Sequence, residues 1–233
     1  DITKVNLSYA LNNDSMMYVT FSEGYRPGGA NRTTQLGATY DADFLESKEI
    51  GFKSMLMDGR LRLNGALYIM DWDDIQLGWF DSSISLLGLV DNIGKAESDG
   101  TEIDLKYLVN DAVSIAVGFS ENSTALKEDY TLRGVVEARD GQDLPFTPDK
   151  KYNVTINVDI TDTSSFQFNH VFVDEMWNDL FYDDRELQDS YAISNMSFTT
   201  QLGDNSTMQI YMDNVFDEVA ELYINSEDIE RLT

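Results

Sequence analysis

Apolar and polar residues alternate with a period of two along most of this chain. Between Lys4 and Tyr9, and again between Tyr152 and Ile160, every second residue is apolar and the residues between them are mostly polar. Such a pattern places one face of a β-strand against an apolar phase and the other against polar groups or water. It recurs with no convincing helix between the repeats and predicts about ten strands: Lys4–Leu11, Ser15–Tyr25, Phe44–Met57, Arg60–Asp71, Glu102–Tyr107, Ala112–Phe119, Tyr152–Ile160, Ser165–Met176, Tyr191–Leu202 and Thr207–Phe216.

Short and long connections between these strands alternate strictly. The short ones have the Asn, Asp and Gly residues of tight turns, and they fall at Asn12–Asp14, Asp58–Gly59, Asn110–Asp111, Thr161–Ser164 and Gly203–Asn205. The long ones cover residues 26–43, 78–90, 127–149 and 178–189 and everything after 217. Since consecutive strands run in opposite directions, we expect the tight turns at one end of the sheet and the long connections at the other.

Two all-β architectures fit this pattern. A soluble β-sandwich or barrel, such as a binding or adhesion domain, is the simpler interpretation. Many of the strands, however, are ten to fourteen residues long, which is enough to cross a bilayer at a tilt. Short turns at one end and long loops at the other are typical of outer-membrane barrels. We therefore predict an antiparallel up-and-down transmembrane β-barrel; no apolar run approaches the roughly 18 residues of a membrane helix.

Charge and composition narrow the function further. The 233 residues include 42 Asp and Glu against 16 Lys and Arg, a net charge of −26, which argues against nucleic acid as a partner. There is no Cys, and therefore neither a disulfide nor a thiolate site. Segments 71–91, 121–150, 174–189 and 213–233 together hold 26 acidic and 6 basic residues. Most of these belong to the long connections, so we expect an acidic outer rim, which divalent cations could bridge to lipopolysaccharide.

Polar residues within the strands predict a charged inner face. Glu49 and Lys53 have the same phase on one strand, and Arg60 and Arg62 share a phase on the next. We expect these side chains to form a charge ladder facing the lumen, where they contact the wall or a plug rather than a ligand. Gly51 and Gly65 lie within strands, where the lack of a side chain lets neighbouring groups approach.

Two sites invite a chemical interpretation that the sequence does not favour. Asp71–Asp74 (Asp-Trp-Asp-Asp) is the densest acidic cluster, but it lacks the spacing of a calcium loop, and we interpret it as a strand end with Trp72 at the membrane interface. His170 is the only His and shares a face with Phe166, Phe168 and Phe172, which predicts a solvated or interfacial side chain. We therefore expect no catalytic residue, no enzyme, no metal site and no cofactor beyond an optional loop-bound calcium.

Aromatic and arginine residues of the long connections are the better candidates for a binding site. Exposed aromatic rings stack on sugars or on ligand rings, and an arginine pairs with an anionic ligand. The candidates are Arg26, Arg32, Trp79, Phe80, Trp177, Tyr182 and Arg185, with Phe181 in the same connection as Tyr182. The alternative for the aromatic residues is a girdle at the outer membrane interface.

An ordered series of short motifs resembles the TonB-dependent outer-membrane receptor family. The series spans roughly residues 15–223, and its order rather than any single block makes it specific. It consists of Gly24-Tyr25-Arg26-Pro27-Gly28-Gly29-Ala30-Asn31, Glu46-Ser47-Lys48-Glu49-Ile50-Gly51-Phe52-Lys53-Ser54, Asp58–Tyr68 running into Asp71–Gln76, Asn92-Ile93-Gly94-Lys95-Ala96-Glu97, Gly100-Thr101-Glu102-Ile103-Asp104, and Asp213-Asn214-Val215-Phe216-Asp217.

The resemblance implies that residues 1–233 are one partial domain, about ten strands of a 22-strand barrel that encloses a plug. It implies location in the outer membrane of a Gram-negative bacterium and import of a scarce nutrient, such as a ferric siderophore or similar chelate, with energy from TonB. The plug, the TonB box that contacts TonB, and the last strand would lie outside this sequence. The implied partners are the TonB complex, a small-molecule ligand, membrane lipid and lipopolysaccharide. A carbohydrate-importing receptor of the same family and a passive porin or structural barrel are the alternatives.

Overall fold

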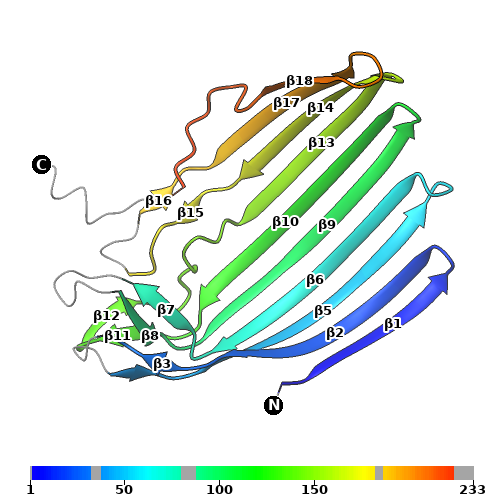
Figure 1. The fold of residues 1–233 in the computed structure, drawn as a ribbon. Coiled ribbons are helices and arrows are strands. Elements are labelled where there is room, and N and C mark those ends of the chain that lie inside the picture. Colours follow the sequence, from blue (N-terminus) through cyan, green and yellow to red (C-terminus); the bar gives the residue numbers. More distant parts are fainter. Residues whose placement is uncertain (1, 33–37, 80–87, 182–185, 223–233) are drawn as a thin grey trace, which may run out of the picture.

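Ten long antiparallel strands form a single sheet in which sequence neighbours are spatial neighbours (Figure 1). The structure is a computed structural model that describes residues 2–32, 38–79, 88–181 and 186–222. The order across the sheet is β1-β2-β5-β6-β9-β10-β13-β14-β17-β18. The bounds are β1 Lys4–Asn12, β2 Ser15–Arg26, β5 Asp43–Leu56, β6 Leu61–Asp73, β9 Ala96–Asn110, β10 Val113–Leu126, β13 Lys150–Thr161, β14 Ser164–Val173, β17 Tyr191–Gln201 and β18 Thr207–Met212.

The meander of ten strands confirms the predicted fold class. β14 and β18 end earlier than expected, at Val173 and Met212, and two central strands are longer than expected. β9 begins at Ala96 rather than Glu102, and β10 continues to Leu126, seven residues beyond Phe119. In these extensions both faces of the strand carry polar residues, as in Ser120–Thr124, so the alternation stops although the hydrogen-bonded pairing continues. Among the described residues no helix is long and apolar enough to span a bilayer.

The long connections carry four small hairpins that the sequence pattern did not indicate. Their strands are β3 Gly29–Ala30 with β4 Thr39–Tyr40, β7 Gln76–Trp79 with β8 Leu89–Asn92, β11 Tyr130–Leu132 with β12 Val135–Ala138, and β15 Met176–Trp177 with β16 Leu187–Gln188. With two to four residues each, these strands are too short to show a period. All four hairpins lie at the same end of the sheet, opposite the tight turns (Figure 1).

The cross-strand register gives the sheet one apolar and one polar face. On the apolar face Ile103, Phe119, Tyr152 and Phe172 lie directly opposite one another on β9, β10, β13 and β14. The apolar side chains of β13 alternate from Tyr152 to Ile160. At about 3.4 Å per residue and a tilt of about 40°, they cover about 21 Å, close to the apolar band of an outer-membrane barrel.

The polar face carries the charge ladder that the sequence predicts. Lys53, Asn64 and Asp104 are in register across β5, β6 and β9. Arg62 donates to Asp104 at 3.0 Å, and the Lys53 ammonium lies 5.6 Å from the centre of the Tyr18 ring. Glu49 lies on this face as well, opposite Tyr68. Glu49, Lys53 and Arg62 therefore share one face, as predicted. Arg60 does not join them: it lies in the turn before β6, donates to the carbonyl oxygen of Leu108 at 3.0 Å and lies 5.8 Å from the centre of the Tyr107 ring.

Glycines within the strands accommodate rings from the strand beside them. Gly51 is fully covered and lies opposite Tyr18, so that a Cβ added there would meet the tyrosine hydroxyl oxygen at 2.5 Å and the carbonyl oxygen of Gly65 at 2.7 Å. A Cβ at Gly65 would meet the ring of its cross-strand partner Phe52 at 2.6 Å. Both glycines therefore permit close approach, as the sequence predicts.

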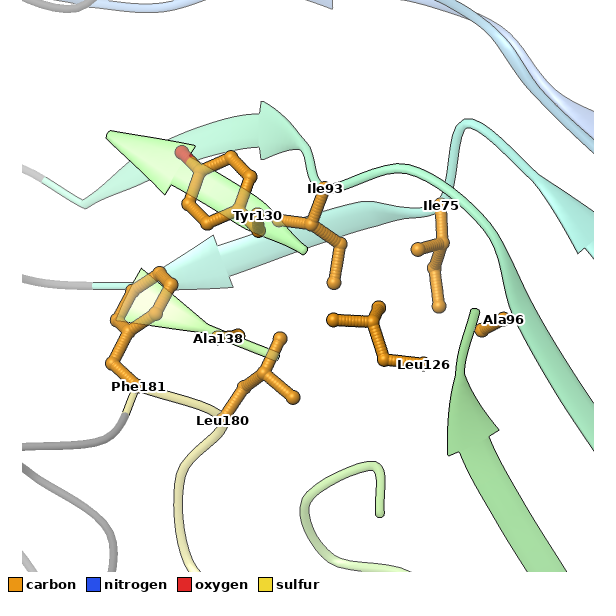
Figure 2. Close-up of a cluster of buried hydrophobic side chains, with 8 residues drawn as sticks. All are labelled: Ile75, Ile93, Ala96, Leu126, Tyr130, Ala138, Leu180 and Phe181. Atoms are coloured by element: carbon orange, nitrogen blue, oxygen red, sulfur yellow. The ribbon is translucent and has the colours of Figure 1, made fainter. Parts of the chain in front are cut away.

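The buried core lies at the end of the long connections rather than between layers of sheet. Eight side chains from four segments of the chain form it (Figure 2). They are Ile75, Ile93, Ala96, Leu126, Tyr130, Ala138, Leu180 and Phe181. Since the faces of the sheet itself are largely exposed, this cluster is the part of the described structure that most resembles the interior of a soluble protein.

Candidate functional site

The described parts of the four long connections form a structure that we call the rim. They are residues 27–32 and 38–42, 74–79 and 88–95, 127–149, and 174–181 and 186–190. Three of the four acidic segments, 71–91, 121–150 and 174–189, fall largely within it, so the acidity gathers at this end of the sheet as the sequence predicts. Each tight turn at the opposite end contributes little charge by comparison. The rim is therefore the candidate site, and its internal contacts decide what it can do.

The first connection is fixed at its base by a buried carboxylate. Asp43, which is 1% exposed, accepts hydrogen bonds from the backbone N–H and guanidinium of Arg26 and from the backbone N–H of Gln76 at 3.1 Å. Burial alone would raise the pKa of Asp43, but these hydrogen bonds and the Arg26 charge outweigh it and hold the pKa below its usual value. The guanidinium also lies 5.1 Å from the centre of the Trp72 ring.

Side-chain amides join the first connection to the second. Asn31 donates to the carbonyl oxygen of Val90 at 2.8 Å and accepts from the N–H of Val90 at 2.9 Å, replacing a backbone pair. Asn92 donates to the carbonyl oxygen of Asp41 at 3.1 Å and accepts from the N–H of Asp41 at 2.7 Å. It also donates to the carbonyl oxygen of Asp74 at 2.7 Å. These amides satisfy backbone groups that no regular sheet satisfies.

Buried contacts join the second connection to the third. The Tyr130 hydroxyl donates to Asp91 at 2.6 Å, and burial together with this carboxylate raises the pKa of Tyr130. The backbone N–H of Lys127 donates to the carbonyl oxygen of Lys95 at 2.8 Å. The apolar cluster of Figure 2 fills the space between, because Ile75 and Ile93 come from one connection and Tyr130 and Ala138 from the other.

The fourth connection packs against the third. Leu180 is fully buried in the same cluster, and the Phe181 ring stacks on that of Tyr130 with centroids 5.8 Å apart. The N–H of Phe146 donates to the carbonyl oxygen of Trp177 at 2.8 Å. The four connections are thus linked in sequence by hydrogen bonds and apolar packing, and they form one continuous rim.

The four predicted ligand-binding residues that the structure describes lie at this end of the sheet, in different environments. Arg26 is half-exposed but ion-paired with Asp43, Arg32 is exposed, and Trp177 is half-buried in β15. The backbone of Trp79 pairs with Leu89 in the β7–β8 hairpin. Phe80, Tyr182 and Arg185 lie outside the described residues. The binding role of the seven stays a prediction, whereas Phe181 has a packing role.

The Asp71–Asp74 segment differs from its expected position at one residue. The interface position predicted for Trp72 is wrong: its ring packs against the buried cluster beneath Arg26, because the alternation of β6 turns it to the face of Tyr68 and not to that of Asp71. Among the described residues no group of three or more His, Asp or Glu side chains could hold a metal ion.

His170 lies on the apolar face, is half-buried and has a hydrogen-bonding partner. Its Nδ1 lies 2.8 Å from the hydroxyl of Ser194, and its ring is near those of Tyr152 and Phe168. Ser194 is completely buried, so its hydroxyl is inaccessible to a substrate and the pair has a structural role. The prediction of a solvated or interfacial histidine missed Ser194, whose partnership depends on pairing across β14 and β17.

Sequence reasoning did not find the residues that hold the rim together. Asp43 and Tyr130 carry no pattern in the sequence, and the amides of Asn31 and Asn92 look like ordinary loop residues. Three motifs of the resemblance point to this region: Gly24–Asn31, Asp71–Gln76 and Asn92–Glu97. The last of them holds two members of the buried cluster, Ile93 and Ala96.

The fold and its two-faced strands define a class: the chain is part of the wall of an antiparallel outer-membrane-type β-barrel. Residues 3–215 match the family described as TonB dependent receptor-like, beta-barrel. The chain belongs to this family, whose members are transporters and not enzymes, and this confirms both the predicted family and the absence of an enzymatic role.

Relatives and solved structures agree with this assignment. The chain is 24% identical over 220 residues to the pesticin receptor of Yersinia pestis, which covers 92% of this chain and 31% of that protein. It is 25% identical over 118 residues to the ferric-pyoverdine 358 receptor of Pseudomonas putida. This alignment covers 50% of this chain and 14% of that protein. The chain thus spans about a third or less of the length of the curated relatives it matches.

Two solved receptors have the same fold. The ferric yersiniabactin uptake receptor FyuA from Yersinia pestis superimposes with a TM-score of 0.74 at 23% identity, over 92% of this chain and 32% of that one. The ferric-catecholate import receptor Fiu from E. coli K12, in its closed form, superimposes with a TM-score of 0.72 at 20% identity. The superposition covers 96% of this chain and 32% of that one. At these identities the likeness concerns the fold alone.

Proposed function

We propose that this chain is part of the barrel wall of an outer-membrane receptor that imports a ferric siderophore or a similar chelate with energy from TonB. The observation that carries the proposal is the continuous rim, in which four connections are packed over their own buried core. A rim fixed in this way presents a preformed surface to a ligand, which reduces the ordering cost of binding. A passive channel has no need of such a surface.

The family and its named relatives support the choice of ligand class. The relatives include a receptor whose name specifies ferric pyoverdine, and the solved structures include receptors for ferric yersiniabactin and ferric catecholates. The rim of this chain is strongly acidic, which disfavours capture of a highly anionic chelate by long-range attraction. We therefore favour a chelate of low net charge that is held by short-range contacts with arginine and aromatic side chains.

Uptake of radioactive iron by cells that express the full-length receptor tests the proposal. Cells are given a panel of ferric siderophores, with and without a functional TonB. We expect uptake of at least one chelate that requires both the receptor and TonB. Uptake of a glycan alone would favour a carbohydrate importer instead.

Conductance distinguishes the passive alternative. A plugged receptor in a planar bilayer is expected to conduct almost no current, whereas a porin conducts steadily. A steady open conductance of the purified full-length protein would contradict the proposal, even if iron uptake were observed.

A further inference from the structure

The buried core of the rim lies against the polar face of the sheet, which faces the lumen in a barrel. Trp72, Ala96 and Leu126 lie directly opposite one another on β6, β9 and β10, and all three belong to this cluster or pack against it. Trp72 has the phase of Tyr68, which lies on the polar face, whereas its neighbour Asp73 points to the other face and is exposed. The connections that complete the cluster therefore fold over the inner face of the wall.

The β11–β12 hairpin of the third connection is one of the segments on this inner face. Tyr130 and Ala138, at its base, are members of the buried cluster (Figure 2), and Leu132 packs against that cluster. Thr131 alternates with these residues and pairs with Val136, which is 43% exposed. One face of the hairpin is thus anchored to the wall, and the other is open toward the mouth of the lumen.

A two-residue turn at the tip of this hairpin holds an arginine in an unfavourable backbone conformation. Leu132 pairs with Val135, and the two residues between them, Arg133 and Gly134, have φ angles of 51° and 85°. Positive φ at both positions is the signature of a type I′ turn, which Asn, Asp or Gly normally opens because a larger side chain is strained there. Backbone strain of this kind is concentrated at functional sites. The geometry of the turn therefore does not account for the arginine.

The charge of Arg133 is unused within the described part of the chain. Its side chain is exposed and makes no ion pair or hydrogen bond with another described residue. Arg26 and Arg62 differ, because they pair with Asp43 and Asp104. The third connection is mostly acidic, since residues 127–149 include six acidic and three basic residues. The guanidinium of Arg133 therefore presents a positive charge on an acidic rim, at a fixed position over the lumen.

We propose that Arg133 determines specificity by pairing with a carboxylate on the periphery of the imported chelate. The planar guanidinium donates two parallel N–H bonds to a carboxylate, and the anchored hairpin holds the donor in place before the ligand arrives. An acidic rim disfavours a ligand of high negative charge, and a single fixed arginine selects one that has low net charge and an outward-facing carboxylate. The inference rests on the proposed function, because it specifies the ligand of the same rim.

Equilibrium binding of radioactive ferric chelates to the full-length receptor in detergent micelles tests the inference. The chelates hold iron through hydroxamate, catecholate or phenolate groups, and each is supplied with a free peripheral carboxylate and as its methyl ester. We expect at least one pair of which the wild-type receptor binds the carboxylate form about tenfold more tightly. Arg133→Asn is expected to abolish this preference, while the thermal unfolding midpoint of the variant stays the same or rises, since Asn suits the turn.

Two further variants distinguish pairing at Arg133 from a general effect of charge. Arg133→Lys should keep part of the preference. Lys127→Asn removes a positive charge from the same connection, where Lys127 is ion-paired with Glu97, and should keep all of it. The inference is overturned if the wild type shows no preference, if Arg133→Asn retains it or has a lower unfolding midpoint, or if Lys127→Asn loses it equally. Binding of no chelate at all would contradict the proposed function, and the inference with it.

Discussion

Asp43 is an almost fully buried carboxylate whose hydrogen-bond donors come from β2 and from the second connection. Arg26 at the end of β2 supplies both a backbone and a guanidinium donor, and Gln76 supplies a backbone N–H from the second connection. Removing one partner of such a site leaves the others unsatisfied, which costs more than the net value of the contact.

The depressed pKa of Asp43 predicts a loss of rim stability in acid. The contribution of the carboxylate is complete above its unfolded pKa, about 3.9, and disappears as the pH falls through the lower pKa of the folded state. Asp43→Asn is expected to weaken protection of residues 26–32 by about 1–2 kcal/mol at pH 7, since Arg26 is half-exposed. Amide hydrogen exchange of both proteins between pH 3 and 7, corrected for intrinsic rates, measures the effect. Identical pH profiles would disprove the role of Asp43.

Gly51 gives a second prediction at this scale. An alanine there would place its Cβ against the Tyr18 ring and the backbone of Gly65, so Gly51→Ala is expected to destabilise the full-length receptor by about 1–3 kcal/mol. Gly24→Ala is the matched control, because nothing lies within 4 Å of its added Cβ. Urea unfolding in detergent micelles measures the stability of both variants. Equal unfolding midpoints for the two would contradict the prediction.

At the scale of elements, the strands were predictable and the rim was not. Alternation along Lys4–Tyr9 and Tyr152–Ile160 reports the contrast between lipid and polar surroundings, and that contrast acts on every second residue of a strand. Ile75, Leu126, Ala138 and Leu180 meet in one core, but each lies in or beside a long connection whose sequence has no apolar period. No local period can indicate that they converge, because their proximity depends on the order of strands in the sheet.

The linkage between connections predicts that a change in one is felt in another. Tyr130→Phe removes the hydrogen bond to Asp91, at a cost of about 2 kcal/mol, and keeps the stack on Phe181. Tyr130→Ala also removes the stack and should cost about 3–5 kcal/mol. Hydrogen exchange is expected to show loss of protection near residues 88–92 in both variants, and near 176–181 in the alanine variant alone. Val135→Ala, at an exposed position, is the control.

At the scale of the whole molecule, the two faces of the sheet must meet different solvents. Ile103 is on the apolar face of β9, and its neighbour Glu102 is on the polar face. Ile103→Arg is expected to destabilise the full-length receptor in lipid vesicles by about 2–4 kcal/mol, and Glu102→Arg by less than about 1 kcal/mol. Urea titration monitored by tryptophan fluorescence measures both. Similar losses would mean that the assignment of faces is wrong.

The serial linkage of the rim also limits how such a receptor can change its specificity. Each connection is fitted to the one before it and the one after it: Asn31 and Asn92 serve one junction, and Tyr130 serves both of the others. A single connection transplanted from a relative would arrive without the surfaces that its neighbours require. New ligand preferences should therefore be inherited or engineered in blocks of adjacent connections.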